Sequence, residues 1–517
     1  MSSLIRILRD PKKPIRLVRP RFFQRCIEKN EPMPCRQELP EKAFLDIESF
    51  TDDELEKRLD VISISYCRLD PKHPDPKSVH MKTIAKLLEC YLTGTEEKAK
   101  KLYKPHPSSS EMSATYLKRQ GYRMGAGEGK RIVGVFLDWV SIYQDKPWGR
   151  YTGDEVMRTK EEIEVSESAL QHAGVLYAHR ETVVWMLTYL PIDLPKIPEW
   201  TDEDGVVHPA AFRADFDSSG WPTFERRMAA LNKRPGDLLN ITLDKREKLL
   251  MGKIPQFEPE DGPVEWKHAW AIANGDYVRL CMETMDKLRG MPMAPSEFGD
   301  LIRTKRFFDD DAVTGDMVTV AIPQFRRAFE SIIGEAEILC YADMGYSSEE
   351  AQTFLKSTIA TGHCQALRTF DMSGNRIGIS VESLARSLNE GAQNLEVLIL
   401  SGNSGLYGNI TAFSQLPKLK ELHLDGTQVD GDVESLSKLQ NLRCLFLRGT
   451  KVTGNVESLV ALKELEEVWL SETKVGGELD SLVALKNLRK LNVWFTQVPL
   501  LGTKDLLQKA NPELIIY

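Results

Sequence analysis

The segment SGWPTFERRMAAL, residues 219–231, contains the residue best suited to chemistry, Glu225. Pro222 suits the first position of a helix, because its missing N–H needs no partner there. Apolar side chains then recur at helical spacing and predict a buried face of Phe224, Met228 and Leu231. A carboxylate in the first turn is stabilised by the positive end of the helix dipole. Glu225 therefore serves either to favour the helix start or to act on a bound molecule.

Other polar residues lie where predicted strands end. The apolar runs at 60–67, 131–144 and 181–190 are typical of strands buried on both faces, and helical patterns between strands predict a parallel sheet. Ligands of such sheets bind beyond the carboxyl ends of the strands. Four polar residues occupy these positions: Ser65, Tyr66, Asp138 and Glu225. We expect an α/β domain with a candidate site at this edge, and core packing is the alternative for Tyr66.

The last third of the chain repeats one pattern. The segments LEVLILSGN, LKELHLDGT, LRCLFLRGT, LEEVWLSET and LRKLNVWFT begin at Leu395, Leu419, Leu442, Leu465 and Leu488. Two longer units begin upstream at Leu339 and Leu367, with a helical return predicted at 381–388. The pattern resembles the L-x-x-L-x-L-x-x-N motif of leucine-rich repeats, with threonine at the asparagine position of the last four. We predict a solenoid of seven repeats over residues 336–517.

The repeat register predicts which side chains face outward. Residues between the leucines should form two rows on the concave side: Ile399, His423, Phe446, Trp469 and Asn492, and then Ser401, Asp425, Arg448, Ser471 and Trp494. Exposed aromatic rings beside charged residues are typical of protein-binding surfaces. The candidate protein-binding residues are Phe446, Arg448, Glu467, Trp469 and Trp494. A scaffold without a specific ligand is the alternative.

Composition excludes several classes of protein. The net charge of −8 is spread along the chain, which disfavours nucleic acid as a partner. The longest apolar run, at 183–190, is too short for a membrane span. Eight scattered cysteines indicate a reducing compartment and hence a cytoplasmic protein, and neither they nor the histidines have metal-ligand spacing. We expect no metal and no bound cofactor.

Two further segments complete the predicted domain organisation. Residues 1–55 begin with eight Lys/Arg and one Asp in the first 25 positions, which predicts a solvated basic arm, with organelle targeting or membrane-surface attachment as alternatives. Residues 56–240 form the α/β domain, and residues 241–335 are predicted to be a helical connector to the repeats.

The α/β motifs resemble a known family. In order and spacing, ISYC, VFLDWVSIYQD, VLYAHRETVVWML and GWPTFE are similar to the successive motifs of the heterokaryon-incompatibility (HET) domain, a distant relative of TIR domains. Matching positions include Ser65, Tyr66, Asp138, Gln144, Tyr177, Trp185, Trp221 and Glu225. Arg68, Ser141 and Gly220 depart from the motifs. The resemblance implies a TIR-like, flavodoxin-like fold and signalling by homotypic assembly.

The same resemblance implies a candidate reaction. In TIR domains that cleave NAD, a glutamate in a W-x-x-x-E segment engages the nicotinamide ribose, and Trp221 to Glu225 is similar to that segment. Glu225 would then be catalytic, with Ser65, Tyr66, Asp138, Gln144 and Trp221 binding the substrate NAD. The alternatives from the residues alone are a strand-end cap for Asp138 and a turn-holding amide for Gln144.

Two functional hypotheses follow. In the first, a leucine-rich sensor binds a protein and controls a HET/TIR-like signalling domain, with or without NAD cleavage. In the second, the whole chain is a non-catalytic binding scaffold. A cleft into which Glu225 opens together with Asp138 and Ser65 would favour the first, whereas an ion pair between Glu225 and an arginine such as Arg213 would favour the second.

Overall fold

The computed structural model describes two compact units. The described residues are 3–29, 31–66, 74–75, 78, 80–82, 84–85, 88, 132–144, 159–179, 182–188, 200–201, 207–208, 219–233, 238–240, 290–305, 314–499 and 504–517. The first unit comprises Met1–Lys104, Thr115–Arg289 and Pro295–Ala328, and the second comprises Pro105–Ala114, Gly290–Ala294 and Phe329–Tyr517. Arg213 and most of the predicted connector, 241–289, lie outside the described residues.

The first unit is built on a parallel sheet, as the apolar runs predict. Its strands are β1 (Leu59–Tyr66), β2 (Ile132–Phe136), β3 (Thr182–Leu187) and β6 (Leu238–Asn240), in the order β2-β1-β3-β6. Each neighbouring pair is parallel. All residues of β1 and β3 are buried, which explains why both segments are continuous apolar runs rather than alternating ones. A separate short antiparallel pair joins β4 (Trp200–Thr201) to β5 (Val207–His208).

Three of the described helices lie between strands of this sheet in the sequence. The short helix α7 (Asp138–Ser141) begins two residues after β2. Helix α8 (Lys160–Ala178) starts with a capping box between Thr159 and Glu162 and leads into β3. Helix α9 (Gly220–Ala230) carries Glu225. Buried Lys233 donates to backbone carbonyls of His179 and Thr182, so its ammonium group joins the end of α8 to the start of β3.

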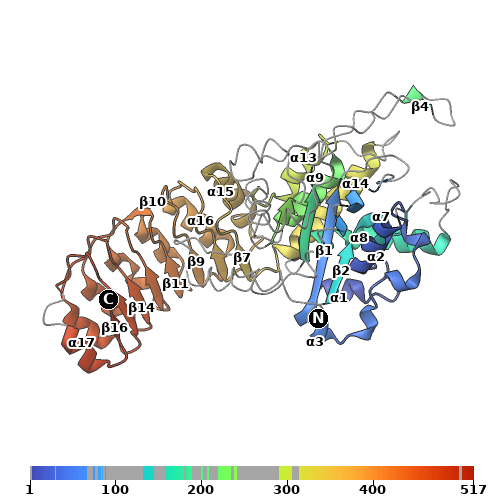
Figure 1. Ribbon diagram of the computed structural model, residues 1–517. Coiled ribbons are helices and arrows are strands. Elements are labelled where there is room, and N and C mark those ends of the chain that lie inside the picture. The colour runs from blue at the N-terminus through green and yellow to red at the C-terminus, as the bar shows by residue number, and fades with distance from the viewer. Residues whose placement is uncertain are drawn as a thin grey trace, which may run out of the picture. The chain divides into compact units, whose positions relative to one another are not determined.

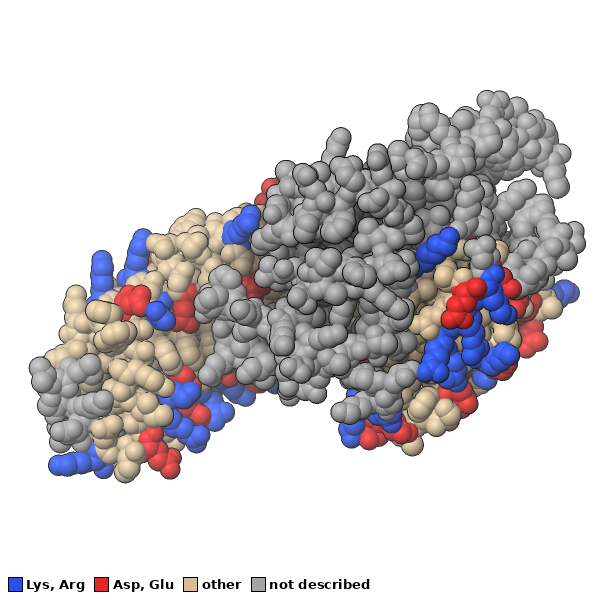
Figure 2. Space-filling view, in the orientation of Figure 1, with Lys and Arg blue, Asp and Glu red and all other residues tan. Residues whose placement is uncertain are grey.

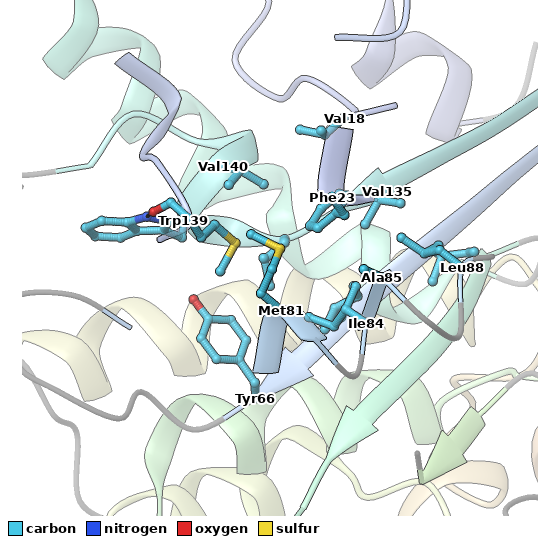
Figure 3. Close-up of a cluster of buried hydrophobic side chains, with 14 of the residues drawn as sticks. Val18, Phe23, Tyr66, Met81, Ile84, Ala85, Leu88, Val135, Trp139 and Val140 are labelled. Atoms are coloured by element: carbon cyan, nitrogen blue, oxygen red, sulfur yellow. Dashed lines mark hydrogen bonds between the residues drawn. The ribbon is translucent and has the colours of Figure 1, made fainter. Parts of the chain in front are cut away.

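The prediction of a solvated basic arm at 1–55 is wrong. The segment folds into α1 (Ser3–Leu8), α2 (Pro20–Glu28), the 3-10 turns η1 (Arg36–Glu38), η2 (Glu41–Ala43) and η3 (Ile47–Ser49), and α3 (Asp52–Arg58). Val18 exchanges backbone hydrogen bonds with Val135 of β2, and Phe23 is fully buried. Figure 3 shows both side chains in one hydrophobic cluster with Val135, Met81 and Tyr66.

The basic residues of this segment are compatible with packing because many have partners. Arg9 pairs with Glu48 and Arg16 with Glu41, and Figure 2 shows acidic side chains among the basic ones on the described surface of this unit. Arg36 is buried, and its guanidinium donates to the carbonyl oxygen of Ser141 at 3.0 Å. Burial lowers the pKa of Arg36 to about 10. The N-terminal segment is therefore part of the α/β core.

The helical residues nearest the repeats divide between the two units. Helix α13 (Pro295–Ile302) places Phe298 6.1 Å from Phe224 of α9, measured between ring centroids. Phe298 also stacks at 4.0 Å on Phe325 of α14 (Thr314–Ile332). Residues 295–328 therefore belong to the first unit rather than to a connector between two domains.

The second unit is a leucine-rich-repeat solenoid. Eight parallel strands lie side by side along it (Figure 1), in the order β16-β15-β14-β13-β11-β9-β8-β7. They are β7 (Ile338–Cys340), β8 (Thr369–Asp371), β9 (Val397–Ile399), β11 (Glu421–His423), β13 (Cys444–Phe446), β14 (Glu467–Trp469), β15 (Lys490–Asn492) and β16 (Ile515–Ile516). The first seven confirm the predicted repeats. The eighth was not predicted, because its short segment lacks the full leucine motif.

The return segments become shorter along the array. The first repeat returns through α15 (Ser348–Phe354) and a π-helical turn, η5 (Leu355–Ile359), and the second through α16 (Val381–Gly391). The α16 helix confirms the predicted return. Later repeats use the 3-10 helices η6 (Ile410–Gln415), η7 (Val433–Lys438), η8 (Val456–Ala461) and η9 (Leu479–Ala484), and α17 (Lys504–Ala510) precedes β16. A separate parallel pair joins β10 (Tyr407–Asn409) to β12 (Gln428–Asp430).

Hydrogen bonds at the strand ends confirm how threonine replaces asparagine. Asn403 donates its amide to two carbonyl oxygens, that of Leu400 in its own repeat and that of Met372 in the preceding one. Thr450 donates only to Leu447 in its own repeat, at 2.7 Å. The hydroxyl has one proton to donate and the amide has two, so threonine holds its own turn but does not join neighbouring repeats.

We expect Leu445→Asp to unfold the repeats around it. Leu445 is fully buried in β13, and an unpaired carboxylate there costs several kcal/mol. Hydrogen exchange of the full chain should rise in peptides from β11 to β15 and stay slow in β1 and β3. Lys451→Asp, at an exposed position of the same repeat, is the control. Equal acceleration in β1 and β3 would contradict independent unfolding of the two units.

Candidate functional site

The parallel sheet brings the predicted polar residues together. Ser65 and Tyr66 end β1, and Asp138 follows β2, its neighbour in the sheet. The Tyr66 hydroxyl donates to Asp138 Oδ1 at 2.8 Å. Glu225 interacts with both Ser65 and Asp138 from helix α9. Residues separated by up to 160 positions in the sequence thus form one cluster at the carboxyl ends of the strands, hereafter the carboxyl cluster.

The structure changes the interpretation of Glu225 itself. Helix α9 begins at Gly220, two residues earlier than Pro222 predicted, so Glu225 lies in the second turn and not at the positive end of the helix dipole. Its side chain is turned inward with only 8% exposure, on the same buried face as Phe224 and Met228. Stabilisation of the helix start therefore does not explain this residue.

Burial and a neighbouring carboxylate control the protonation of Glu225. Burial is the largest cause and Asp138 the second, and together they raise the pKa of Glu225 to about 8. The hydroxyls of Ser65 and Tyr177, which face the carboxyl, oppose part of this rise. Near neutral pH the glutamate side chain is therefore mainly a neutral acid able to donate a hydrogen bond.

Hydrogen-bond donors contact the carboxylate of Asp138. Its Oδ1 accepts hydrogen bonds from the Tyr66 hydroxyl and, at 2.7 Å, from the backbone N–H of Trp139. Both donors favour the charged carboxylate. The two carboxyl groups of the cluster thus lie in different surroundings: hydrogen-bond donors face Asp138, whereas burial keeps Glu225 mainly protonated near neutral pH.

Tyr177 belongs to the carboxyl cluster although we did not predict it as a site residue. It lies in the last turn of α8, its hydroxyl donates to the carbonyl of Ile64 at 3.3 Å, and it faces Glu225. Burial, followed by Glu225 and Asp138, raises the pKa of Tyr177 well above its usual value. Its position in the matched motif VLYAHRETVVWML was the available signal.

Two other predicted substrate-binding residues have structural roles. The Gln144 side chain donates to the carbonyls of Asp138 and Ile142, at 2.8 and 2.9 Å, and so holds the turn after β2. Its main chain also bonds to the side chain of Gln37 from the N-terminal segment. Trp221 is half-buried and meets Phe224 edge-to-face at 5.5 Å. Both residues support the segments that carry Asp138 and Glu225.

The outward face of the solenoid contains stacked rings rather than a freely exposed row. His423 and Phe446 stack at 4.3 Å, Phe446 and Trp469 at 6.1 Å, and Trp469 contacts Tyr517 at 5.3 Å. We call these four residues the ring ladder. Phe446 and Trp469 are half-buried within it, and Ile399, predicted to face outward, is fully buried. Trp469 therefore packs within the fold as well as facing outward.

Charged residues surround the ring ladder in ion pairs. Glu467 accepts from the Trp469 indole at 2.6 Å and pairs with Lys490 at 3.3 Å. Arg448 pairs with Glu472 at 2.9 Å. Trp494, by contrast, is 60% exposed, as predicted, and contacts exposed Phe495 at 4.6 Å between ring centroids.

The described part of the chain shows neither a metal-binding group nor a membrane-spanning helix. Its histidines, cysteines and carboxylates form no group suited to a metal ion, and none of its helices is long and apolar enough to cross a membrane.

Comparisons with known proteins concern the repeat unit. No family profile and no curated protein matches the chain. Similar solved structures include a leucine-rich-repeat protein of Leptospira interrogans (17% identity, 44% of this chain and 63% of that chain, TM-score 0.30) and internalin C2 of Listeria monocytogenes (20%, 36% and 83%, 0.27). A third is the ectodomain of a membrane receptor kinase from Arabidopsis thaliana (21%, 37% and 24%, 0.28). The chain spans less than two thirds of the Leptospira and Arabidopsis chains.

We expect the stability of the first unit to depend on the protonation of Glu225. Its pKa is about 8 in the folded protein against a usual 4.5, so the folded state binds the extra proton between these values. The free energy of unfolding should fall as the pH rises from about 4.5 to about 8, by at most roughly 5 kcal/mol. Glu225→Gln removes this dependence, so it should be more stable than wild type in urea at pH 8.5 and similar to it near pH 4.5.

Glu164→Gln, at an exposed position of α8, is the matched control and should follow wild type at both pH values. An identical pH dependence in wild type and Glu225→Gln would show that Glu225 does not titrate as its burial implies.

Proposed function

We propose that the leucine-rich repeats bind a protein partner through the outward face of the eight-stranded sheet and thereby control the first unit, a HET/TIR-like signalling domain. The exposed Trp494 ring supports the binding role. Tryptophan is among the residues that most often dominate binding energy at protein interfaces. This ring is 60% exposed beside Phe495, so it adds little to the folded core and is available to a partner.

The proposed interface is tested by comparing single exposed aromatic residues. Trp494→Ser should remove the partner from material captured by the full-length protein from cell extract, measured by quantitative mass spectrometry. Tyr407→Ser is the matched control, because Tyr407 is 53% exposed but lies on β10, outside the eight-stranded sheet. Both variants should keep the melting temperature of wild type.

Two outcomes would contradict the proposed interface. Retention of every captured protein by Trp494→Ser would place binding elsewhere. A large fall in its melting temperature would mean that the ring packs internally.

A second candidate function, cleavage of NAD, is favoured by the carboxyl cluster. The charged Asp138 and the neutral Glu225 resemble the carboxyl pairs of glycosidases, which also stabilise an oxocarbenium-like centre. In this proposal the bond between nicotinamide and ribose C1′ breaks, and its electron pair passes to the pyridinium nitrogen. Asp138 stabilises the positive charge on the ribose, and Glu225 donates a hydrogen bond to a ribose hydroxyl. Water adds its oxygen to C1′ and loses a proton to solvent.

The enzymatic proposal predicts which protonation states are active. Asp138→Asn should abolish nicotinamide release, because it removes the negative charge. Glu225→Gln should retain part of the activity, because the amide still donates a hydrogen bond, and it should remove the loss of activity expected as the pH rises through about 8. Nicotinamide is measured by chromatography after incubation with NAD, at protein concentrations that permit homotypic assembly.

The same measurement separates the two proposals. Absence of nicotinamide release by the wild-type protein would contradict the enzymatic proposal. The non-catalytic binding scaffold would then be the remaining function. Equal activity of wild type and Asp138→Asn would assign any observed cleavage to other residues.

A further inference from the structure

The turns after the strands of the solenoid contain an unusual substitution. Four turns place glycine at one equivalent position with positive φ: Gly374, Gly402, Gly426 and Gly449, at 66°, 76°, 66° and 67°. The next two repeats adopt the same backbone with Glu472 at 60° and Phe495 at 53°. A side chain with a Cβ is strained in this conformation, and a bulky one is rare there.

Among the described residues, packing compensates little of this strain at Phe495. The residue is 68% exposed, so burial of the ring contributes little to stability. Its ring contacts the neighbouring ring of Trp494, which is also exposed. Strained backbone with no structural compensation is characteristic of ligand-binding positions. The two rings thus form an exposed pair at the end of β15.

The charge of the surrounding face indicates what this pair binds. The outward residues and turns of β8 to β15 include five carboxyl groups, Asp371, Glu421, Asp425, Glu467 and Glu472, and two basic groups, Arg448 and Lys490. Within the described residues, Lys490 pairs with Glu467 and Arg448 with Glu472. Of the other three carboxyl groups, Glu421 lies 3.2 Å from the ring of His423, Asp371 is buried, and Asp425 accepts from the backbone N–H of Arg448. Burial raises the pKa values of Asp371 and Asp425, and the nearby His423 and, at Asp425, Arg448 offset only part of that rise.

We propose that this face takes a basic segment of the protein partner, with one arginine side chain lying against the Trp494–Phe495 pair and bonding to Glu472. The inference rests on the proposed binding function and specifies the chemistry of the partner. A guanidinium group stacks on aromatic faces and donates two parallel hydrogen bonds to a carboxylate. The remaining basic side chains of the segment lie over Glu421 and Asp425.

Arg448 has a defined role in this arrangement. In the free protein it donates to Glu472 through Nε and Nη2, at 3.1 and 2.9 Å. The partner's arginine therefore competes with Arg448 for the same carboxylate. Removal of Arg448 should strengthen binding of a basic segment, whereas it would weaken binding of an acidic one.

The test uses synthetic peptides and the full chain. The probes are a labelled Gly/Ser peptide with three arginines and a matched peptide with three glutamates, with binding measured by fluorescence anisotropy at low salt. The arginine peptide should bind wild type and the glutamate peptide should not. Trp494→Ser should weaken binding about five-fold, Arg448→Ala should strengthen it, and Tyr407→Ser should leave it unchanged.

Phe495→Gly distinguishes a binding role from a structural one. Glycine relieves the positive-φ strain, so this variant should melt at a higher temperature than wild type and yet bind the arginine peptide more weakly. Unchanged peptide binding by Phe495→Gly, weaker binding by Arg448→Ala, or preference for the glutamate peptide would each overturn the inference. Capture of a partner that still depends on Trp494 would then leave the proposed binding function intact.

Discussion

Parallel strand pairing determines which side chains lie together in each unit, because it places equivalent positions of neighbouring strands side by side. In the first unit, pairing of β1 with β2 puts Tyr66 beside Asp138 and directs the strand ends toward Glu225 on α9. In the second unit, the same geometry stacks His423, Phe446 and the next ring along the array. The carboxyl cluster and the ring ladder therefore consist of residues that are distant in sequence and are brought together by strand pairing.

The sequence predicted the strands correctly where the spacing of apolar side chains follows directly from the burial of a strand. Continuous apolar runs predicted β1 and β3, and the leucine spacing predicted seven solenoid strands, because both patterns follow directly from which face is buried. The N-terminal segment lacks such a period. Its buried residues, such as Val18 and Phe23, are spaced irregularly among prolines and basic residues, so charge dominated the interpretation although Arg16 and Arg36 have partners in the fold.

The carboxyl cluster shows a second limit of sequence analysis. Strand-end positions predicted that Ser65, Asp138 and Glu225 approach one another, but not that Glu225 is turned into the core. That orientation depends on how α9 packs, because Glu225 lies beside Phe224 and Met228 on its buried face. Whether Glu225 is exposed or buried determines its protonation state. An exposed glutamate would be charged, whereas a buried one beside Asp138 is protonated, so the two carboxyl groups have different roles.

The aromatic residues of the solenoid have two different roles. Rings that stack on a ring of the neighbouring strand stabilise the fold, and rings without such a neighbour are available for recognition. Phe446 and Trp469 each have a ring on either side, and Trp469 reaches Tyr517 past the short side chain of Asn492. Stacking buries these rings, so changing them alters the fold as well as any interface. Trp494 and Phe495 lie beyond the ring ladder, in the turn after β15, and contact each other. Their exposure and the strained backbone of Phe495 cost stability without a packing gain, which is why this pair, rather than the larger ladder, carries the argument for recognition.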